Sequence, residues 1–134
     1  MHDMALWVAQ TLAAGFLAVL FLQSGLDKVL DWKGNKEYIG GFFSKTPLRR
    51  FSTLMLFQIT VLEVFAGVIS AAGCVAVALT RDSTFAFFGA ALAGVNVLAL
   101  FFGQRIAKDY AAAAGMVPYA IFSIGAVLLE GASR

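Results

Sequence analysis

A single carboxylate, Glu63, lies in the middle of the apolar run TVLEVFAGVIS. The residues that share a helical face with it, at intervals of 3 or 4, are all small or polar: Thr60, Gly67, Ser70 and Cys74. A charged group at the centre of a membrane helix costs roughly 2.5 to 3.5 kcal/mol on insertion scales. We therefore expect Glu63 to face the interior of a helix bundle, where it is protonated, hydrogen-bonded or paired with a cation.

A second polar residue, Asn96, lies in a similar stripe of another apolar segment. Its partners at intervals of 3 or 4 residues are Gly89, Ala93, Leu100 and Gly103. Asn96 is expected at a depth comparable with that of Glu63, so a direct or water-bridged hydrogen bond between them is a specific hypothesis. The candidate buried polar site consists of Glu63, Asn96, Thr60 and Gln58.

Charged residues also gather just beyond two apolar segments, in LQSGLDKVLDW and GQRIAKDY. They form a candidate interfacial charge cluster: Asp27, Lys28, Arg105, Lys108, Asp109 and Tyr110. Charges in such places usually anchor a helix end at the membrane interface. The alternative is that Lys28, Lys108 or Arg105 turns inward and supplies a cation towards Glu63.

The composition limits the class of protein and the chemistry. Sixty per cent of the 134 residues are hydrophobic and only 13 per cent are charged, with a mean hydropathy of +0.83, so lipid is the natural solvent. The net charge of +2 carries no interleaved basic and aromatic surface, which excludes nucleic acid as a partner. Since Cys74 and His2 are the only cysteine and histidine, we expect no metal site and no cofactor held covalently or by a metal ligand.

Four apolar segments are long enough to cross a hydrocarbon core roughly 30 Å thick, which takes about 20 helical residues. They span about 5–26, 51–79, 84–103 and 111–129. The sequence therefore predicts an all-α integral membrane four-helix bundle, formed by residues 1–134 as a single domain. The stretch YIGGFFSKTPL between the first two helices is typical of a loop or short helix lying at the membrane surface.

Lys and Arg residues are unevenly divided between the two ends of this bundle. The connections after the first and third segments hold six and two of them, whereas the opposite end holds two. By the positive-inside rule, the connections after the first and third segments face the cytoplasm and both termini lie outside.

Three stretches together resemble the DoxX-like family of small four-helix membrane proteins: FLQSGLDKVLDW, LEVFAGVISAAG and GQRIAKDYAAAAGMVPY. Gly25, Lys28, Asp31 and Glu63 correspond by position to the family pattern. The resemblance implies a bacterial or archaeal cytoplasmic membrane and a partner in a membrane oxidoreductase complex, with quinone as a candidate ligand.

Three functions remain open from the sequence. The first is an accessory or anchoring subunit of a quinone-linked oxidoreductase, in which Glu63, Asn96, Gln58 or Tyr110 contacts a quinone head group. The second is a proton or small-solute pathway formed by a homo-oligomer, in which Glu63 changes protonation. The third is a structural interaction module, in which Glu63 and Asn96 only fix the register of the helices. In none of these is the chain expected to be catalytic alone, because its thiol and hydroxyl groups have no histidine partner.

Overall fold

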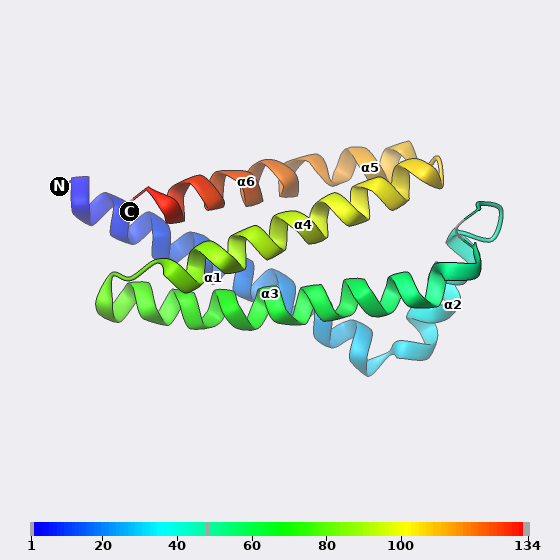
Figure 1. Ribbon diagram of the computed structural model, residues 1–134, viewed down its shortest axis with the longest axis horizontal. Coiled ribbons are helices and arrows are strands. Elements are labelled where there is room, and N and C mark those ends of the chain that lie inside the picture. Colours follow the sequence, from blue (N-terminus) through cyan, green and yellow to red (C-terminus); the bar gives the residue numbers. More distant parts are fainter. Residues whose placement is uncertain (1, 48, 133–134) are drawn as a thin grey trace.

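The computed structural model describes residues 2–47 and 49–132, and within these ranges all regular structure is helical (Figure 1). The elements in chain order are α1 (His2–Leu30), α2 (Trp32–Phe42), the short 3₁₀ helix η1 (Arg49–Phe51), α3 (Ser52–Thr80), α4 (Thr84–Ile106), α5 (Tyr110–Gly115) and α6 (Val117–Gly131). The prediction of an all-α bundle is confirmed.

Four helical stretches are long and apolar enough to cross a membrane: Asp3–Leu30, Arg49–Thr80, Thr84–Ile106 and Tyr110–Gly131. Their outward surfaces carry large apolar side chains, such as Leu12, Phe65 and Leu98, which are all more than half exposed. Contact between such side chains and acyl chains costs no free energy, because lipid tails are as apolar as the side chains. The chain is therefore a multi-pass membrane protein.

The last span differs from the prediction in a way that affects the site. The last span, expected as one helix over 111–129, is divided into α5 and α6 at Met116. Pro118 lies in the first turn of α6, where a missing N–H costs little but the preceding helix is interrupted. The second span, expected over 51–79, is α3, which runs unbroken for 29 residues and so is longer than the roughly 20 residues that cross a hydrocarbon core.

Glycines set the contact between α3 and α4. A Cβ atom on Gly73 would collide with the backbone of Ala86, and a Cβ atom on Gly89 would collide with Ser70. These two contacts fix the antiparallel register of α3 and α4. Glu63 lies seven residues before Ser70 on α3, and Asn96 lies seven residues after Gly89 on α4. Because the two helices are antiparallel, both steps run in the same direction, so Glu63 and Asn96 lie at the same depth.

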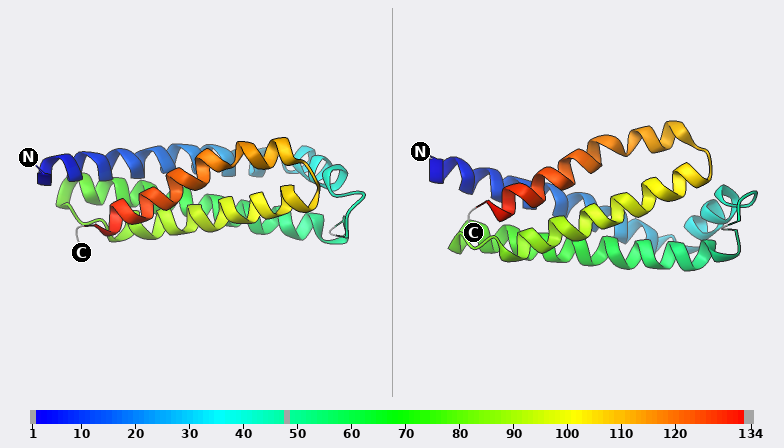
Figure 2. Two further views of the ribbon diagram at one scale, coloured as in Figure 1. Left: turned by 90° about the horizontal axis from the view of Figure 1, so that it is seen from above. Right: turned by 45° about the horizontal axis from the view of Figure 1, so that its top comes forward.

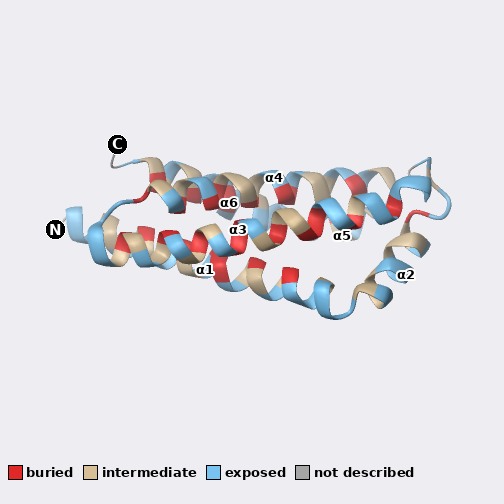
Figure 3. Ribbon diagram, turned by 60° about the horizontal axis from the view of Figure 1, so that its bottom comes forward, coloured by how far each residue is buried: buried red, intermediate tan, exposed pale blue. Residues whose placement is uncertain are grey.

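Helix α1 packs closely on α3 and only slightly on α6. A Cβ atom on Gly67 would lie 2.7 Å from the backbone nitrogen of Leu22, so the two backbones are nearly in contact. In Figure 1 and the right-hand view of Figure 2, α1 lies near α6 at the end with both termini and diverges from α5 at the other end. Figure 3 shows the buried residues along the inner sides of the long helices, whereas α2 has no buried residue.

Three hydrogen bonds join the helices at the end that carries the termini. The indole of Trp7 donates to the carbonyl of Val77 at 2.8 Å, and the Gln10 amide donates to the carbonyl of Leu129 at 2.9 Å. The Ser83 hydroxyl donates to the carbonyl of Glu130 at 2.6 Å. This end is therefore connected by specific polar contacts as well as by packing.

Candidate functional site

Glu63 is buried inside the bundle and paired with a cation. Its Oε2 atom lies 3.0 Å from Nζ of Lys28, which comes from the last turn of α1. The Glu63 side chain is 2% exposed and that of Lys28 is 19% exposed. Lys28 also donates a hydrogen bond to the Ser24 hydroxyl at 3.0 Å, one turn earlier on α1. An ion pair in this low-dielectric setting stabilises both charges only while both partners remain.

The charged residues predicted at this end of the bundle therefore divide into two groups. Lys28 is the inward cation, as one of the two interpretations held. Arg105 is exposed and stacks over the Tyr110 ring at 4.7 Å, while Lys108 is an exposed residue with a left-handed φ of 61° after α4. Asp109 accepts a hydrogen bond from the Ala112 N–H at 3.1 Å and caps the N-terminus of α5.

Asp27 is exposed as well. The charge cluster is thus not one site, because only Lys28 reaches the bundle interior. Arg105 and Tyr110 instead form a surface pair, and Tyr110 does not line the cavity that contains Glu63. Tyr110 was one of four residues expected as possible contacts of a quinone head group, and in this cavity the other residues would have to make that contact.

A cavity of about 210 Å³ lies beside Glu63 and is lined by all four long helical stretches. Its polar groups are Ser24 of α1, Glu63 of α3, Asn96 of α4 and Tyr119 of α6. Its apolar wall includes Leu20, Phe21, Val97, Leu100 and Met116. Met116 is the residue at which α5 gives way to α6, so the helix break borders the cavity.

Asn96 is fully buried, and neither its amide nitrogen nor its amide oxygen has a hydrogen-bond partner among the described residues. Oε2 of Glu63 likewise receives no hydrogen bond of good geometry, so its contact with Lys28 is that of an ion pair. The predicted direct hydrogen bond between Glu63 and Asn96 is therefore not formed. Buried amides are almost always hydrogen-bonded, so the Asn96 amide is the group at this cavity to which a water molecule or a polar ligand could bind.

Two of the predicted site residues lie elsewhere. Thr60 is buried, but its hydroxyl donates a hydrogen bond to the carbonyl of Leu56 at 2.7 Å. The hydroxyl proton is therefore already used within α3. Gln58 is exposed on α3 and does not belong to the buried site. Its position, five residues before Glu63, puts it well off the inward face, so the helical spacing already argued against it.

A second cavity of about 220 Å³ lies under α2 and continues towards the first. Lys28, Gln104 and Leu100 line it, and Leu100 also lines the cavity of Glu63. Its outer wall comes from α2, including Tyr38 and Phe42. The buried Phe43 after α2 contacts the position of Gly103, where an added Cβ would lie 3.2 Å from the Phe43 ring. Helix α2 therefore covers the end of the bundle above the ion pair.

A second buried acid, Glu130, was not among the predicted site residues, because the last helix was expected to end at residue 129. In the structure α6 continues to Gly131, and Glu130 is 1% exposed at the end of the bundle opposite Lys28. Neither of its carboxylate oxygens has a hydrogen-bond partner among the described residues. The spacing of Ser123, Ala126 and Glu130 at intervals of 3 and 4, all three buried, is the signal that would have found it.

Within the described residues, no group of three or more histidine, cysteine, aspartate or glutamate side chains could hold a metal ion. The polar groups at the cavity instead suit a ligand that both donates and accepts hydrogen bonds. No family model matches the chain, and no curated protein or solved structure is significantly similar to it.

Proposed function

We propose that this chain is a membrane subunit that binds the head group of a quinone-type molecule beside Lys28 and Glu63 and serves a membrane oxidoreductase. The observation that carries the proposal is the Asn96 amide, which is fully buried at a cavity with both polar atoms unbonded in the described part of the chain. An amide can donate to a quinone carbonyl and accept from a quinol hydroxyl. Asn96 therefore suits both oxidation states of such a head group.

The ion pair beside Asn96 adds groups that can respond to a change in the charge of the ligand. Reduction of a quinone consumes protons, and a carboxylate or an ammonium within reach of the ring oxygens can exchange them. Lys28 is held by Glu63 and Ser24, each 3.0 Å from its Nζ, so its position is fixed before a ligand arrives. Such preorganisation lowers the cost of binding.

The size of the cavity favours a head group with its tail outside. Pockets that enclose a whole drug-sized ligand usually measure about 300 to 1,000 Å³, whereas this cavity measures about 210 Å³. It is bordered by Leu20 of α1 and by Met116 and Tyr119 of α5 and α6, at the end where these helices diverge. An isoprenoid tail would leave through this side into the lipid.

The oxidoreductase partner and the bacterial or archaeal cytoplasmic membrane rest on the DoxX-like resemblance of the sequence. A chain with one cysteine and one histidine offers few ligands for a redox centre of its own. The electrons would therefore come from a subunit bound to this bundle. The quinone site and the partner are therefore tested separately.

A proton or solute pathway has less support. Between the cavity and Glu130 the bundle interior is filled by an apolar cluster of buried residues: Ala13, Leu17, Phe21, Ala66, Ala90, Ala93, Val97 and Ala126. A pathway from Glu63 to the other face would have to pass this cluster, whose own side chains offer no hydrogen bond, so that the buried hydroxyls of Ser70 and Ser123 would be its main polar groups. A purely structural role does not explain why the Asn96 amide is left unbonded.

The test is to measure quinone binding by the purified protein in lipid nanodiscs. Binding is monitored by the quenching of tryptophan fluorescence, and the amount of quinone extracted per chain is quantified. Asn96→Leu, which keeps the volume and removes both polar atoms, should weaken binding about tenfold or more. Ser123→Ala is the matched control, because Ser123 is buried on α6 but does not line the cavity. Equal quinone binding by wild type and Asn96→Leu would refute the proposed site.

A further inference from the structure

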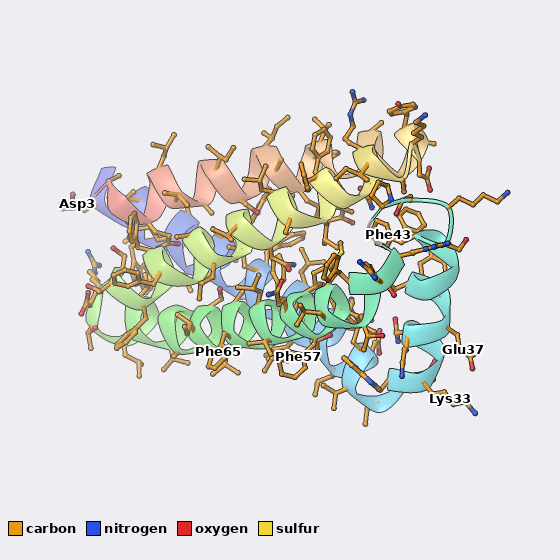
Figure 4. The ribbon with its side chains drawn as sticks, turned by 45° about the vertical axis from the view of Figure 1, so that its right-hand side comes forward. Asp3, Lys33, Glu37, Phe43, Phe57 and Phe65 are labelled. Carbon is orange, nitrogen blue, oxygen red and sulfur yellow. The ribbon has the colours of Figure 1, made fainter. Side chains whose placement is uncertain are left out.

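An apolar groove of about 480 Å³ runs along the outer surface of the bundle, where the end of α1 meets α3. Its lining includes Val29 and Trp32 on one side and Phe57, Val61, Val64 and Phe65 on the other. Figure 4 shows Phe57 and Phe65 projecting from the same side of α3, away from the other helices. The groove is therefore open to lipid along one flank of the protein.

The groove is separate from the cavity of Glu63. A Cβ atom on Gly25 of α1 would lie 2.8 Å from Cγ2 of Val64 and 3.2 Å from its backbone nitrogen, so α1 and α3 are in close contact between the two spaces. Neither Glu63 nor Asn96 lines the groove. A ligand of the groove is thus different from a ligand of the cavity.

Two exposed basic residues lie close in the chain to residues at one end of the groove. Lys33 follows the groove residue Trp32 and is exposed near the α1–α2 corner (Figure 4), and the exposed Arg50 precedes Phe57 by two helical turns. Apart from Lys28, which is paired with Glu63, residues 27–50 hold five Lys and Arg against three Asp and Glu. Tryptophan at such a place is typical of headgroup depth. The groove thus joins an apolar flank to a net positive rim.

We propose that this groove binds an anionic phospholipid, with one acyl chain against Phe57, Val61 and Phe65 and the phosphate group near Lys33 and Arg50. The eight helical steps from Phe57 to Phe65 rise about 12 Å, which approaches the half-thickness, about 15 Å, of the hydrocarbon core. The groove is therefore about as deep as one leaflet. Basic residues at the interface attract anionic lipids in this way.

The charge of the rim favours a lipid over a second copy of the chain. Two copies that met through this face would bring the same basic residues together, and like charges across an interface oppose association. An anionic phospholipid avoids that repulsion, because its phosphate meets the basic residues while its acyl chain fills the apolar groove. The inference does not depend on the quinone site.

The experiment is native mass spectrometry of the protein released from nanodiscs that contain phosphatidylethanolamine and phosphatidylglycerol in equal amounts. The wild type should keep one lipid per chain, with phosphatidylglycerol preferred about tenfold. The double variant Lys33→Gln/Arg50→Gln should lose this preference. Phe57→Ala should lower retention of both lipids.

Two control variants make the result specific. Lys108→Gln removes an exposed basic residue at the same end but away from the groove, and Phe88→Ala removes an equally exposed aromatic ring on α4. Both should behave like wild type. The inference would be overturned if the wild type retained the two lipids equally, or if Lys108→Gln lost the preference as strongly as Lys33→Gln/Arg50→Gln. Dimers in place of lipid-bound monomers would also overturn it. Quinone binding should be unchanged in Lys33→Gln/Arg50→Gln, so the two proposals fail separately.

Discussion

Glu63 on α3 and Asn96 on α4 lie at the same depth and line one cavity, yet no hydrogen bond joins them. The register follows from the close contacts of Gly73 with Ala86 and of Gly89 with Ser70. The carboxylate is paired with Lys28, whereas the amide faces the cavity without a partner in the described structure. The two polar groups therefore differ in role, and the predictions below separate them.

Loss of Lys28 should cost more stability than loss of the Glu63 charge. Lys28→Met leaves a 2% exposed carboxylate without a counter-charge, and breaking a buried pair in this way costs about 3 to 5 kcal/mol. In Glu63→Gln, the 19% exposed Lys28 keeps its bond to Ser24 and can extend towards water, so the loss should be smaller. Thermal unfolding in mild detergent, followed by tryptophan fluorescence, measures both.

The double variant Lys28→Met/Glu63→Leu should recover most of the stability lost in Lys28→Met, because no buried charge remains. Lys33→Met, at an exposed position nearby, is the control and should leave the unfolding temperature unchanged. If Lys28→Met unfolds at the temperature of the control, the ion pair does not stabilise the bundle.

Gly73→Ala should destabilise the protein by about 1 to 3 kcal/mol, because the new methyl group would collide with the backbone of Ala86. Gly125→Ala is the matched control on α6, since a Cβ atom there meets no heavy atom within 4 Å. Its effect should remain within about 1 kcal/mol. Similar unfolding temperatures for the two variants would contradict the close approach of α3 and α4.

A single substitution should cross-link α1 to α3. A Cβ atom on Gly15 would lie 3.5 Å from Sγ of Cys74, which is within reach of a disulfide after small adjustments. Oxidised Gly15→Cys should therefore lose both thiols to maleimide labelling under denaturing conditions. Gly94→Cys, whose nearest neighbour is Ser123, should keep both thiols reactive. Free thiols in oxidised Gly15→Cys would show that these helices are placed differently.

Labelling in membrane vesicles tests the orientation expected from the distribution of Lys and Arg. In a Cys74→Ala background, Asp3→Cys and Ser44→Cys place an exposed thiol at opposite ends of the bundle. A membrane-impermeant maleimide should label Asp3→Cys in right-side-out vesicles and Ser44→Cys in inverted ones. The reverse pattern would put the termini in the cytoplasm.

Helical spacing was sufficient to predict the four spans and the inward faces of α3 and α4. Glu63 and Asn96 are buried where an interval of 3 or 4 residues placed them, because small and polar residues in lipid are drawn to helix contacts. The same rule would have excluded Gln58 and included Glu130. Local signals were also available for the break at Met116, since Pro118 follows within two residues.

The local sequence pattern could not identify Lys28 as the cation that pairs with Glu63. Lys28, Arg105 and Lys108 all stand at helix ends on the same side of the bundle, and their sequence positions are equally compatible with an inward turn. The difference arises from packing: Gly25 brings α1 close to α3 at Val64, which leaves Lys28 beside Glu63. Contacts of this kind depend on how helices far apart in the chain approach one another.

The hydrogen bonds of Trp7, Gln10 and Ser83 all lie at the end of the bundle that carries the termini. At the opposite end α1 and α5 diverge around the cavity. Thermal fluctuations should therefore be unequal, with a stiff half that holds the fold together and a softer half that widens to admit a ligand. Hydrogen exchange should be slower in the backbone near Val77 and Leu129 than near Met116.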